Sequence, residues 1–129
     1  MTDDTQLIAD NSVYTEKLSQ VFGILEKTSI VLFEWSICAD TPVKYVSKNI
    51  SNYGYSAEDF LSGKIDYWDF VHKDDVERTK NKVYEKRASR EKEYKHTYRV
   101  VCKDGSIRWV EEWTLWERDE NGNPISEKG

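Results

Sequence analysis

The sequence predicts an α+β domain in which helices accompany an antiparallel pair of long strands. Segments 94–102 and 107–115 are rich in β-branched and aromatic residues, and Asp104-Gly105 between them is a dipeptide typical of a β-hairpin turn. Segment 12–28 instead repeats its apolar residues at helical spacing. Short segments with helix-capping residues lie between these two regions. Helices and antiparallel strands in separate runs are the pattern of an α+β domain.

The size and charge of the chain limit what it can be. With 129 residues and 38% hydrophobic content, it can build one globular core. The net charge is −5, and the basic residues are interspersed with acidic ones, which excludes the clustered basic face of a nucleic-acid-binding domain. No apolar run approaches the roughly 20 residues of a membrane span, and the N-terminus does not resemble a signal peptide. We therefore expect a cytoplasmic domain without nucleic-acid or membrane contacts.

The N-terminal region divides into two parts. Residues 1–11 are polar and acidic, so we expect a flexible leader or linker. Residues 12–28 are expected to form a flanking amphipathic helix. Its apolar stripe consists of Tyr14, Leu18, Val21, Phe22 and Leu25. The stripe needs a partner surface, which is either the sheet of the same domain or the same helix of a second copy in a homodimer.

Two strands and two short helices are expected next. Segments 30–38 and 43–47 are β-branched and aromatic and are expected to be the first two strands. A short helix is expected over 48–52. Another begins at Ser56, with Asp59 at the capping-box position.

A short aromatic helix and a longer helix follow. The aromatic helix is expected over 67–71. The longer one is expected to start at Asp74, which has Glu77 three residues on, and to end near Arg90. Its thin apolar face consists of Val76, Thr79 and Val83.

The hairpin predicts which side chains share a face. If Asp104-Gly105 is a two-residue turn, Lys103 lies opposite Ser106 and the register is fixed from there. The core face then carries Tyr94, His96, Tyr98, Val100 and Cys102 opposite Leu115, Trp113, Glu111, Trp109 and Ile107. A slip of one residue exchanges the faces, so the assignment depends on the turn.

The order of these segments resembles the PAS sensory domains that carry a C-terminal PAC motif. The resemblance rests on Trp68-Asp69-Phe70-Val71-His72, the capped helix after it, and the hairpin at Lys103-Asp104-Gly105-Ser106, and it runs from about Ser29 to Ile125. It implies a PAS core over 29–129 with a five-stranded antiparallel sheet and short helices on one face.

The resemblance also implies a last strand between the first strand and the hairpin. Because the chain ends soon after the turn at 119–124, we expect this last strand to be missing or truncated. Its place would be filled by the C-terminal tail, by a swapped segment or by a second molecule, because unpaired strand edges recruit other chains.

Enzyme and cofactor signatures are weak. The sequence has no phosphate loop, no HExxH and no recognisable Ser-His-Asp arrangement, so we expect a non-catalytic domain. Light-sensing PAS domains that form a flavin adduct use a Cys near the aromatic helix, and 67–71 contains none. Haem-binding relatives use a His on the long helix, and 74–90 contains none. Neither cofactor is expected, and other ligands stay open.

A small-molecule pocket is expected between the core face of the hairpin and the helices. The candidate ligand-binding residues are His96, Tyr98, Glu111, Trp113, Trp68, Phe70 and Val83. Burying an unpaired carboxylate costs several kcal/mol, so Glu111 should contact His96 or Tyr98, backbone, water or a ligand. The alternative is a polar cluster that satisfies itself, or a shifted register.

The resemblance implies a sensory and signalling module of a larger protein, such as a sensor histidine kinase of a two-component system or a cyclic-dinucleotide enzyme. Its output domain would lie in the same polypeptide, and its partners would be a second copy and a small-molecule ligand. The alternatives are a ligand-free module for interaction and dimerisation, and a small ligand-carrying or catalytic α+β domain. An open cavity favours sensing, and a fully packed core favours pure interaction.

Overall fold

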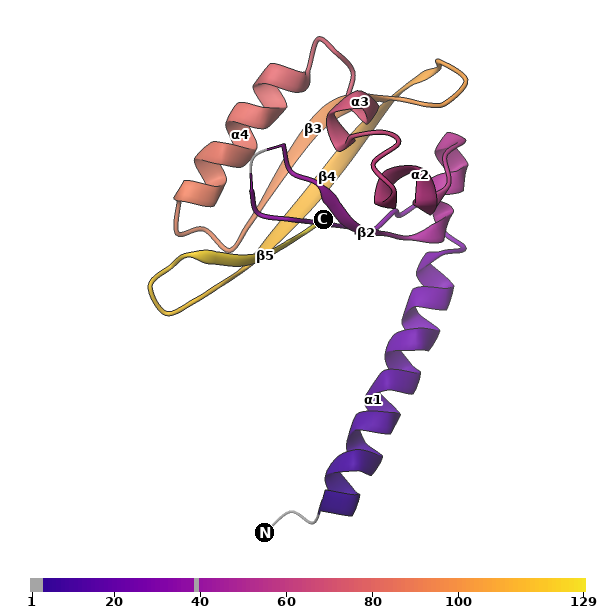
Figure 1. Ribbon diagram of the computed structural model, residues 1–129, viewed down its shortest axis with the longest axis vertical. Helices are drawn as coiled ribbons and strands as arrows, with labels where there is room; N and C mark the ends of the chain where they lie inside the picture. The colour runs from indigo at the N-terminus through magenta and orange to yellow at the C-terminus, as the bar shows by residue number, and fades with distance from the viewer. Residues whose placement is uncertain (1–3, 39) are drawn as a thin grey trace.

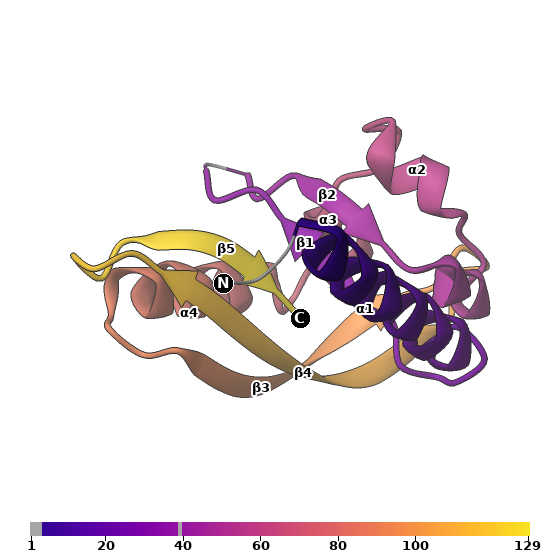
Figure 2. The same ribbon diagram turned by 90° about the horizontal axis from the view of Figure 1, so that it is seen from below.

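The computed structural model describes residues 4–38 and 40–129 and shows one five-stranded antiparallel sheet with strand order β2-β1-β5-β4-β3 (Figures 1 and 2). The strands are β1 (Phe33–Trp35), β2 (Val43–Val46), β3 (Glu93–Val101), β4 (Ile107–Arg118) and β5 (Pro124–Lys128). The helices are α1 (Asp4–Leu25), the 3-10 helix η1 (Lys48–Tyr53), α2 (Ala57–Leu61), α3 (Tyr67–Phe70) and α4 (Val76–Ala88). The predicted α+β class and the five-stranded sheet are confirmed.

The last strand is present, so the prediction that it is missing is wrong. The C-terminal segment itself forms β5, which was one of the three ways predicted to fill the gap. On one side β5 pairs with residues 115–118 of β4, and on the other with Glu34 and Trp35 of β1. Gly129 extends this pairing, because it exchanges two backbone hydrogen bonds of 2.7 and 3.0 Å with Phe33. Among the described residues, the stretch 107–114 of β4 has no strand on its β5 side.

The hairpin between β3 and β4 turns on three residues, which makes the predicted register wrong by one residue. The Cys102 N–H donates to the Ser106 carbonyl at 2.8 Å, and the Gly105 N–H donates to the Cys102 carbonyl at 2.9 Å. Gly105 has a φ of +88°, the left-handed conformation typical of the third position in such a loop. Val101 therefore pairs with Ile107. In the same register Tyr98 pairs with Val110 and His96 with Glu112.

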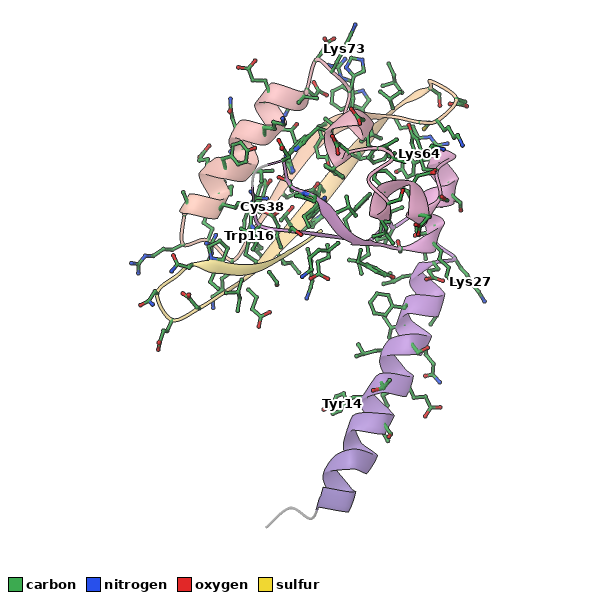
Figure 3. All side chains as sticks on the ribbon, viewed as in Figure 1. Tyr14, Lys27, Cys38, Lys64, Lys73 and Trp116 are labelled. Carbon is green, nitrogen blue, oxygen red and sulfur yellow. The ribbon has the colours of Figure 1, made fainter. Side chains whose placement is uncertain are left out.

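Helix α1 begins at Asp4, earlier than the predicted start at residue 12, and ends at Leu25 rather than near residue 28. Of the predicted leader, residues 1–3 lie outside the described residues and the rest belong to the helix. The helix projects away from the sheet, and Tyr14 points into solvent with 69% of its surface exposed (Figures 1 and 3). Near its C-terminal end, the ring of Phe22 meets Tyr45 at 6.2 Å. The stripe therefore packs on its own sheet only at this end, and Tyr14, Leu18 and Val21 stay exposed.

Local capping fixes the short helices between β2 and β3. Ser56 and Asp59 form the predicted capping box of α2, and Asp66 and Asp69 form a second one at α3. The N-cap of α4 is Asp75, one residue later than predicted. Its carboxylate turns toward β3, where it accepts hydrogen bonds from Arg99, instead of capping the helix.

Gly54 ends η1 and fits tightly against the hairpin loop. Its φ is +89°, and a Cβ there would lie 2.9 Å from the Cβ of Lys103. The Lys103 N–H donates to the Tyr53 carbonyl at 2.9 Å, so this contact joins the loop to the helical layer. A residue with a side chain at position 54 would be strained by its backbone and crowded by its neighbour.

Aromatic side chains from β1, α2 and α3 form the centre of the core. Phe33 packs against Tyr67 and Phe60 edge to face, with ring centroids 5.1 and 5.7 Å apart, and stacks on Trp35 at 5.6 Å. Such pairs add to the free energy of burial. Phe70 lies in the same group and is 3% exposed. Among the described residues, no helix combines the length and apolarity needed to cross a bilayer.

Candidate ligand pocket and polar core

The site residues predicted from the sequence fall into two groups, those that face the core and those on the outer face of the sheet. His96 and Tyr98 face the core from β3, as predicted. Trp68, Phe70 and Val83 are buried and reach the core from α3 and α4. Glu111 and Trp113 instead lie on the outer face of the sheet, and Trp113 is 56% exposed.

The shifted register explains this difference and identifies the residue that sequence reasoning missed. Because the loop has three residues, the even-numbered positions of β4 face the core. Glu112 therefore occupies the place predicted for Glu111, opposite His96. The prediction of a buried carboxylate beside His96 and Tyr98 was right in its chemistry and wrong by one position.

Glu112 is the centre of a buried hydrogen-bond cluster. Its carboxylate accepts hydrogen bonds from the hydroxyls of Tyr98 and Thr114, and from that of Tyr67 at 3.2 Å. His96 Nε2 lies 3.1 Å from the carboxylate oxygen that also accepts from Thr114. The hydroxyls of Tyr67 and Tyr98 are also in contact with each other. The carboxylate is thus held from β3, β4 and α3.

The cluster keeps Glu112 ionised. Burial alone would raise the pKa of its carboxyl. The hydrogen bond and the charge interaction with His96, together with the hydrogen bonds from Thr114 and Tyr98, outweigh that effect and hold the pKa below its usual value. Burial is also the main reason why the pKa values of Tyr67 and Tyr98 lie well above the normal value, and the Glu112 charge raises both further. Both tyrosines are therefore neutral donors at pH 7.

A buried ion pair joins α4 to β5. Arg87 donates to both carboxylate oxygens of Glu127, at 3.1 and 2.7 Å, and Glu127 is only 1% exposed. The indole N–H of Trp116 donates to Glu127 at 2.8 Å, and Arg87 also reaches the Thr41 hydroxyl at 3.1 Å. This pair was not predicted from the sequence, because Glu127 lies in a polar C-terminal segment that was not expected to form a complete strand.

A small cavity of about 10 Å³ lies between the two carboxylates. Its lining includes Glu112, Glu127, Trp35, Trp68 and Thr79. The indole nitrogens of both tryptophans and the Thr79 hydroxyl are buried and have no hydrogen-bond partner among the described residues. A volume of this size matches a single water molecule, which needs two to four polar neighbours. This part of the core has room for a water, not for an organic ligand.

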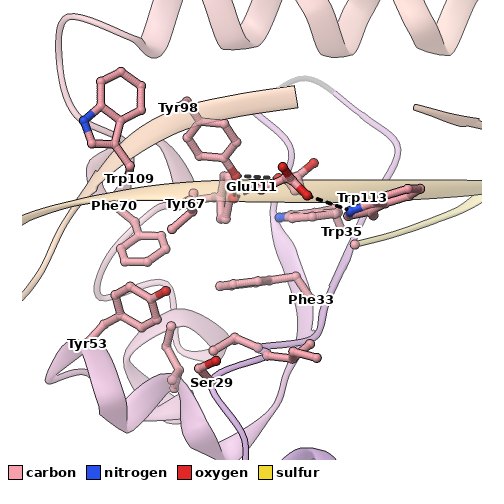
Figure 4. A pocket seen from close by; sticks show the side chains of 16 residues that line it. Ser29, Phe33, Trp35, Tyr53, Tyr67, Phe70, Tyr98, Trp109, Glu111 and Trp113 are labelled. Atoms are coloured by element: carbon pink, nitrogen blue, oxygen red, sulfur yellow. Dashed lines mark hydrogen bonds between the residues drawn. The ribbon is translucent and has the colours of Figure 1, made fainter. Parts of the chain in front are cut away.

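A larger, open pocket of about 510 Å³ lies between β1, α3 and the part of β4 beyond β5 (Figure 4). Aromatic side chains make up much of its wall: Phe33, Trp35, Tyr53, Tyr67, Phe70, Tyr98, Trp109 and Trp113. Glu111 and Glu112 are its two charged lining residues. The indole N–H of Trp113 donates to Glu111 at 3.2 Å, as Figure 4 shows.

The predicted ligand-binding residues line this pocket only in part. Tyr98, Phe70, Glu111 and Trp113 contribute to its wall. Trp68 and Val83 line the small cavity instead, and His96 reaches the pocket through its contact with Glu112. Within residues 4–38 and 40–129, no group of three or more His, Cys, Asp or Glu side chains is placed to hold a metal ion.

A family model and a curated protein both match much of the chain. The family model described as PAS fold matches residues 43–129. The methyl sulfide methyltransferase-associated sensor of Methanosarcina acetivorans is 37% identical over 99 residues, which are 77% of this chain and 10% of that protein. The chain therefore spans about a tenth of the length of the curated relative it matches.

Solved structures agree with this fold. The PAS domain of a Colwellia psychrerythraea protein has a TM-score of 0.68 at 18% identity and covers 86% of this chain and 91% of that one. The PAS domain of the HTR-like protein from Haloarcula marismortui has a TM-score of 0.66 at 19% identity and covers 93% of both chains. The N-terminal domain of a Marinobacter aquaeolei diguanylate cyclase with a PAS/PAC sensor has a TM-score of 0.63 at 16% identity, over 77% and 89%.

Proposed function

The chain belongs to the PAS-fold family, and from that premise we propose that it is a sensory module whose small-molecule ligand occupies the open pocket beside Glu112. The module acts within a larger signalling protein, because the relative named as a sensor is about ten times as long as the matched region. The output domain would be a histidine kinase or a cyclic-dinucleotide enzyme, in line with the names of structural neighbours.

One observation carries the proposal, namely that the pocket reaches a buried, ionised carboxylate. A volume of about 510 Å³ falls in the range of small-molecule sites, which are mostly apolar with a few placed polar groups. Glu112 is such a group, and its hydrogen bonds extend to β3 and α3. A ligand that contacts Glu112 competes with these bonds and so favours one arrangement of the core over another.

Native mass spectrometry of the purified protein tests the proposal. A small-molecule mass that is retained under gentle conditions and lost on denaturation would identify a ligand. Glu112→Gln should reduce its retention. Glu117→Gln, which changes an exposed carboxylate on the same strand outside the pocket, should not. If the protein carries nothing and no compound in a fragment library shifts the NMR signals of the pocket residues, the sensing role is refuted.

A second role, dimerisation through α1, is favoured by the exposed stripe on that helix. Tyr14, Leu18 and Val21 are each more than half exposed, and with Leu25 they follow the alternating spacing of four and three residues found in coiled coils. Phe22 lies beside them and is partly covered by Tyr45. An unpartnered stripe of this kind is stabilised by a second copy of the helix.

Light scattering during gel filtration tests the dimer. We expect a dimer that Leu18→Glu converts to a monomer, because a charge at a seam position loses its apolar contact and repels its counterpart. Gln20→Glu adds the same charge outside the stripe and should leave the dimer intact. A monomeric wild-type protein at the highest attainable concentration would contradict this role.

A further inference from the structure

We propose that the open pocket selects a small organic cation, such as an amine or a quaternary ammonium compound with an apolar body. This inference rests on the proposed sensing function and adds the chemical class of the ligand. It is drawn from the charge of the lining, the aromatic wall and the hydrogen bonding of Glu112.

The charge of the lining favours a cation. Of the described residues that line the pocket, two are acidic and none is Lys, Arg or His. Glu111 is exposed and has Lys95 at 3.8 Å, so part of its charge is compensated. Glu112 is the more important of the two, because its carboxylate is largely shielded from water and its field is weakly screened.

The partners of Glu112 hold the carboxylate in place, and most of them leave its charge uncompensated. Three of the four are hydroxyls, from Tyr67, Tyr98 and Thr114, and a neutral hydroxyl donates a hydrogen bond but contributes no positive charge. The fourth is His96, which compensates part of the charge when it is protonated. An anionic ligand would bring a second negative charge next to Glu112 and would be rejected.

The wall supplies the other half of a cation site. Phe33, Trp35 and Tyr67 line the pocket, and aromatic rings attract cations through the negative charge of their faces. The same sheet already uses this interaction on its outer face, where the Lys95 ammonium lies 5.2 Å from the ring of Trp113. Aromatic rings around a carboxylate are the combination that recognises amines and quaternary ammonium groups in proteins.

Three ligands of nearly the same shape and different charge test the inference. Choline carries a positive charge, 3,3-dimethylbutan-1-ol is its neutral carbon analogue, and 3,3-dimethylbutanoate is negatively charged. Each is titrated into the wild-type protein by calorimetry at moderate salt, together with indole as a neutral aromatic probe. We expect choline to bind at least about tenfold more tightly than the alcohol, and the carboxylate to bind most weakly.

Variants locate the effect at Glu112. Glu112→Gln should weaken choline binding by about tenfold or more and leave the alcohol nearly unchanged. Glu117→Gln should change neither. The comparison of the three ligands on the wild-type protein does not depend on the stability of any variant.

The outcomes separate this inference from the proposed function. If the alcohol binds as tightly as choline, or the carboxylate binds more tightly, cation selection is refuted while the ligand pocket stands. If indole binds and choline does not, the same conclusion holds. If none of the four compounds binds, cation selection is refuted. The NMR fragment screen then shows whether the sensing role is refuted as well.

Discussion

Asp75 gives the sharpest test of how the helical layer is held to the sheet. Its carboxylate, almost fully buried, accepts three hydrogen bonds from one residue of β3: from the Arg99 backbone N–H at 2.8 Å, from Nε at 3.0 Å and from Nη2 at 2.8 Å. Arg78 lies 3.6 Å away on the same side. This contact ties the N-terminal end of α4 to the C-terminal half of β3. We expect its loss to weaken the whole domain.

The magnitude follows from the bonds that each substitution removes. Asn keeps one carbonyl oxygen for the backbone N–H of Arg99, but its amide group replaces the oxygen that accepts from Nη2. Losing one charge-assisted hydrogen bond and the charge costs about 2 kcal/mol, after allowance for the partial exposure of the Arg99 side chain. Asp75→Ala removes all three acceptors and should cost about 3 kcal/mol. For a domain of this size, 2 kcal/mol lowers the Tm by roughly 8 °C.

The effect should depend on pH with a definite sign. Hydrogen bonding to Arg99 is the main reason why the pKa of Asp75 lies well below its usual value in the folded protein. A lowered folded-state pKa means that the stabilisation is fully present above the unfolded pKa of about 4 and is lost as the pH falls further. The difference between wild type and Asp75→Asn should therefore be largest at pH 7 and should narrow below about pH 4.

Urea unfolding followed by tryptophan fluorescence at pH 7 and pH 3 measures this difference. Asp74→Asn is the matched control, because the Asp74 side chain is 63% exposed and should contribute less than about 0.5 kcal/mol. An unchanged unfolding midpoint for Asp75→Asn at pH 7, or an equal loss at both pH values, would refute the reasoning.

Three other contacts give predictions that the same unfolding assay can check. Gly54→Ala should lower the free energy of unfolding by about 2 kcal/mol, because position 54 has a positive φ and a close Cβ contact. Gly63→Ala is the control: position 63 has a positive φ but open space around it, so the loss should be about 1 kcal/mol. Equal losses of stability for the two variants would contradict the steric part of this account. Arg118 donates hydrogen bonds to the carbonyls of Lys86, Arg87 and Glu91 near the C-terminal end of α4, and to that of Gly122 in the next turn. Arg118→Met should lower the free energy of unfolding by about 2 kcal/mol and speed amide hydrogen exchange at this end of the helix. Unchanged exchange rates would argue against a capping role for Arg118. Glu127→Gln should lower the free energy of unfolding by about 3 kcal/mol, because it leaves Arg87 without its buried counter-charge. An unchanged free energy of unfolding would mean that water compensates the Arg87 charge in place of the carboxylate.

The elements that local chemistry decides were predictable from the sequence. The capping box at Ser56, the aromatic helix near Trp68, and the long strands on either side of Gly105 were placed to within a few residues. Each depends on residues close together in the chain, such as a side chain that caps its own helix. The parity of β3 was also right, which is why His96 and Tyr98 face the core as expected.

The errors came from features that depend on the rest of the fold. Whether the loop that contains Gly105 has two residues or three depends on the twist of the paired strands, and the same sequence is compatible with both. That single residue moved the buried carboxylate from Glu111 to Glu112. The strand β5 has a polar sequence, and its pairing with distant β1 and β4 determines that it is a strand. Glu127 was missed for the same reason.

The central position of β5 has a consequence for how the chain folds. The pairs β1–β2 and β3–β4 form from segments that are close in sequence, but β5 joins them into one sheet, and it is the last of the five strands to be synthesised. The pairing of Glu34 with Lys128 closes a loop that contains most of the chain, and such distant pairings form slowly. During synthesis, β1 and β4 therefore keep unpaired strand edges until β5 has been made. In this interval the chain is most prone to aggregation and to binding by chaperones.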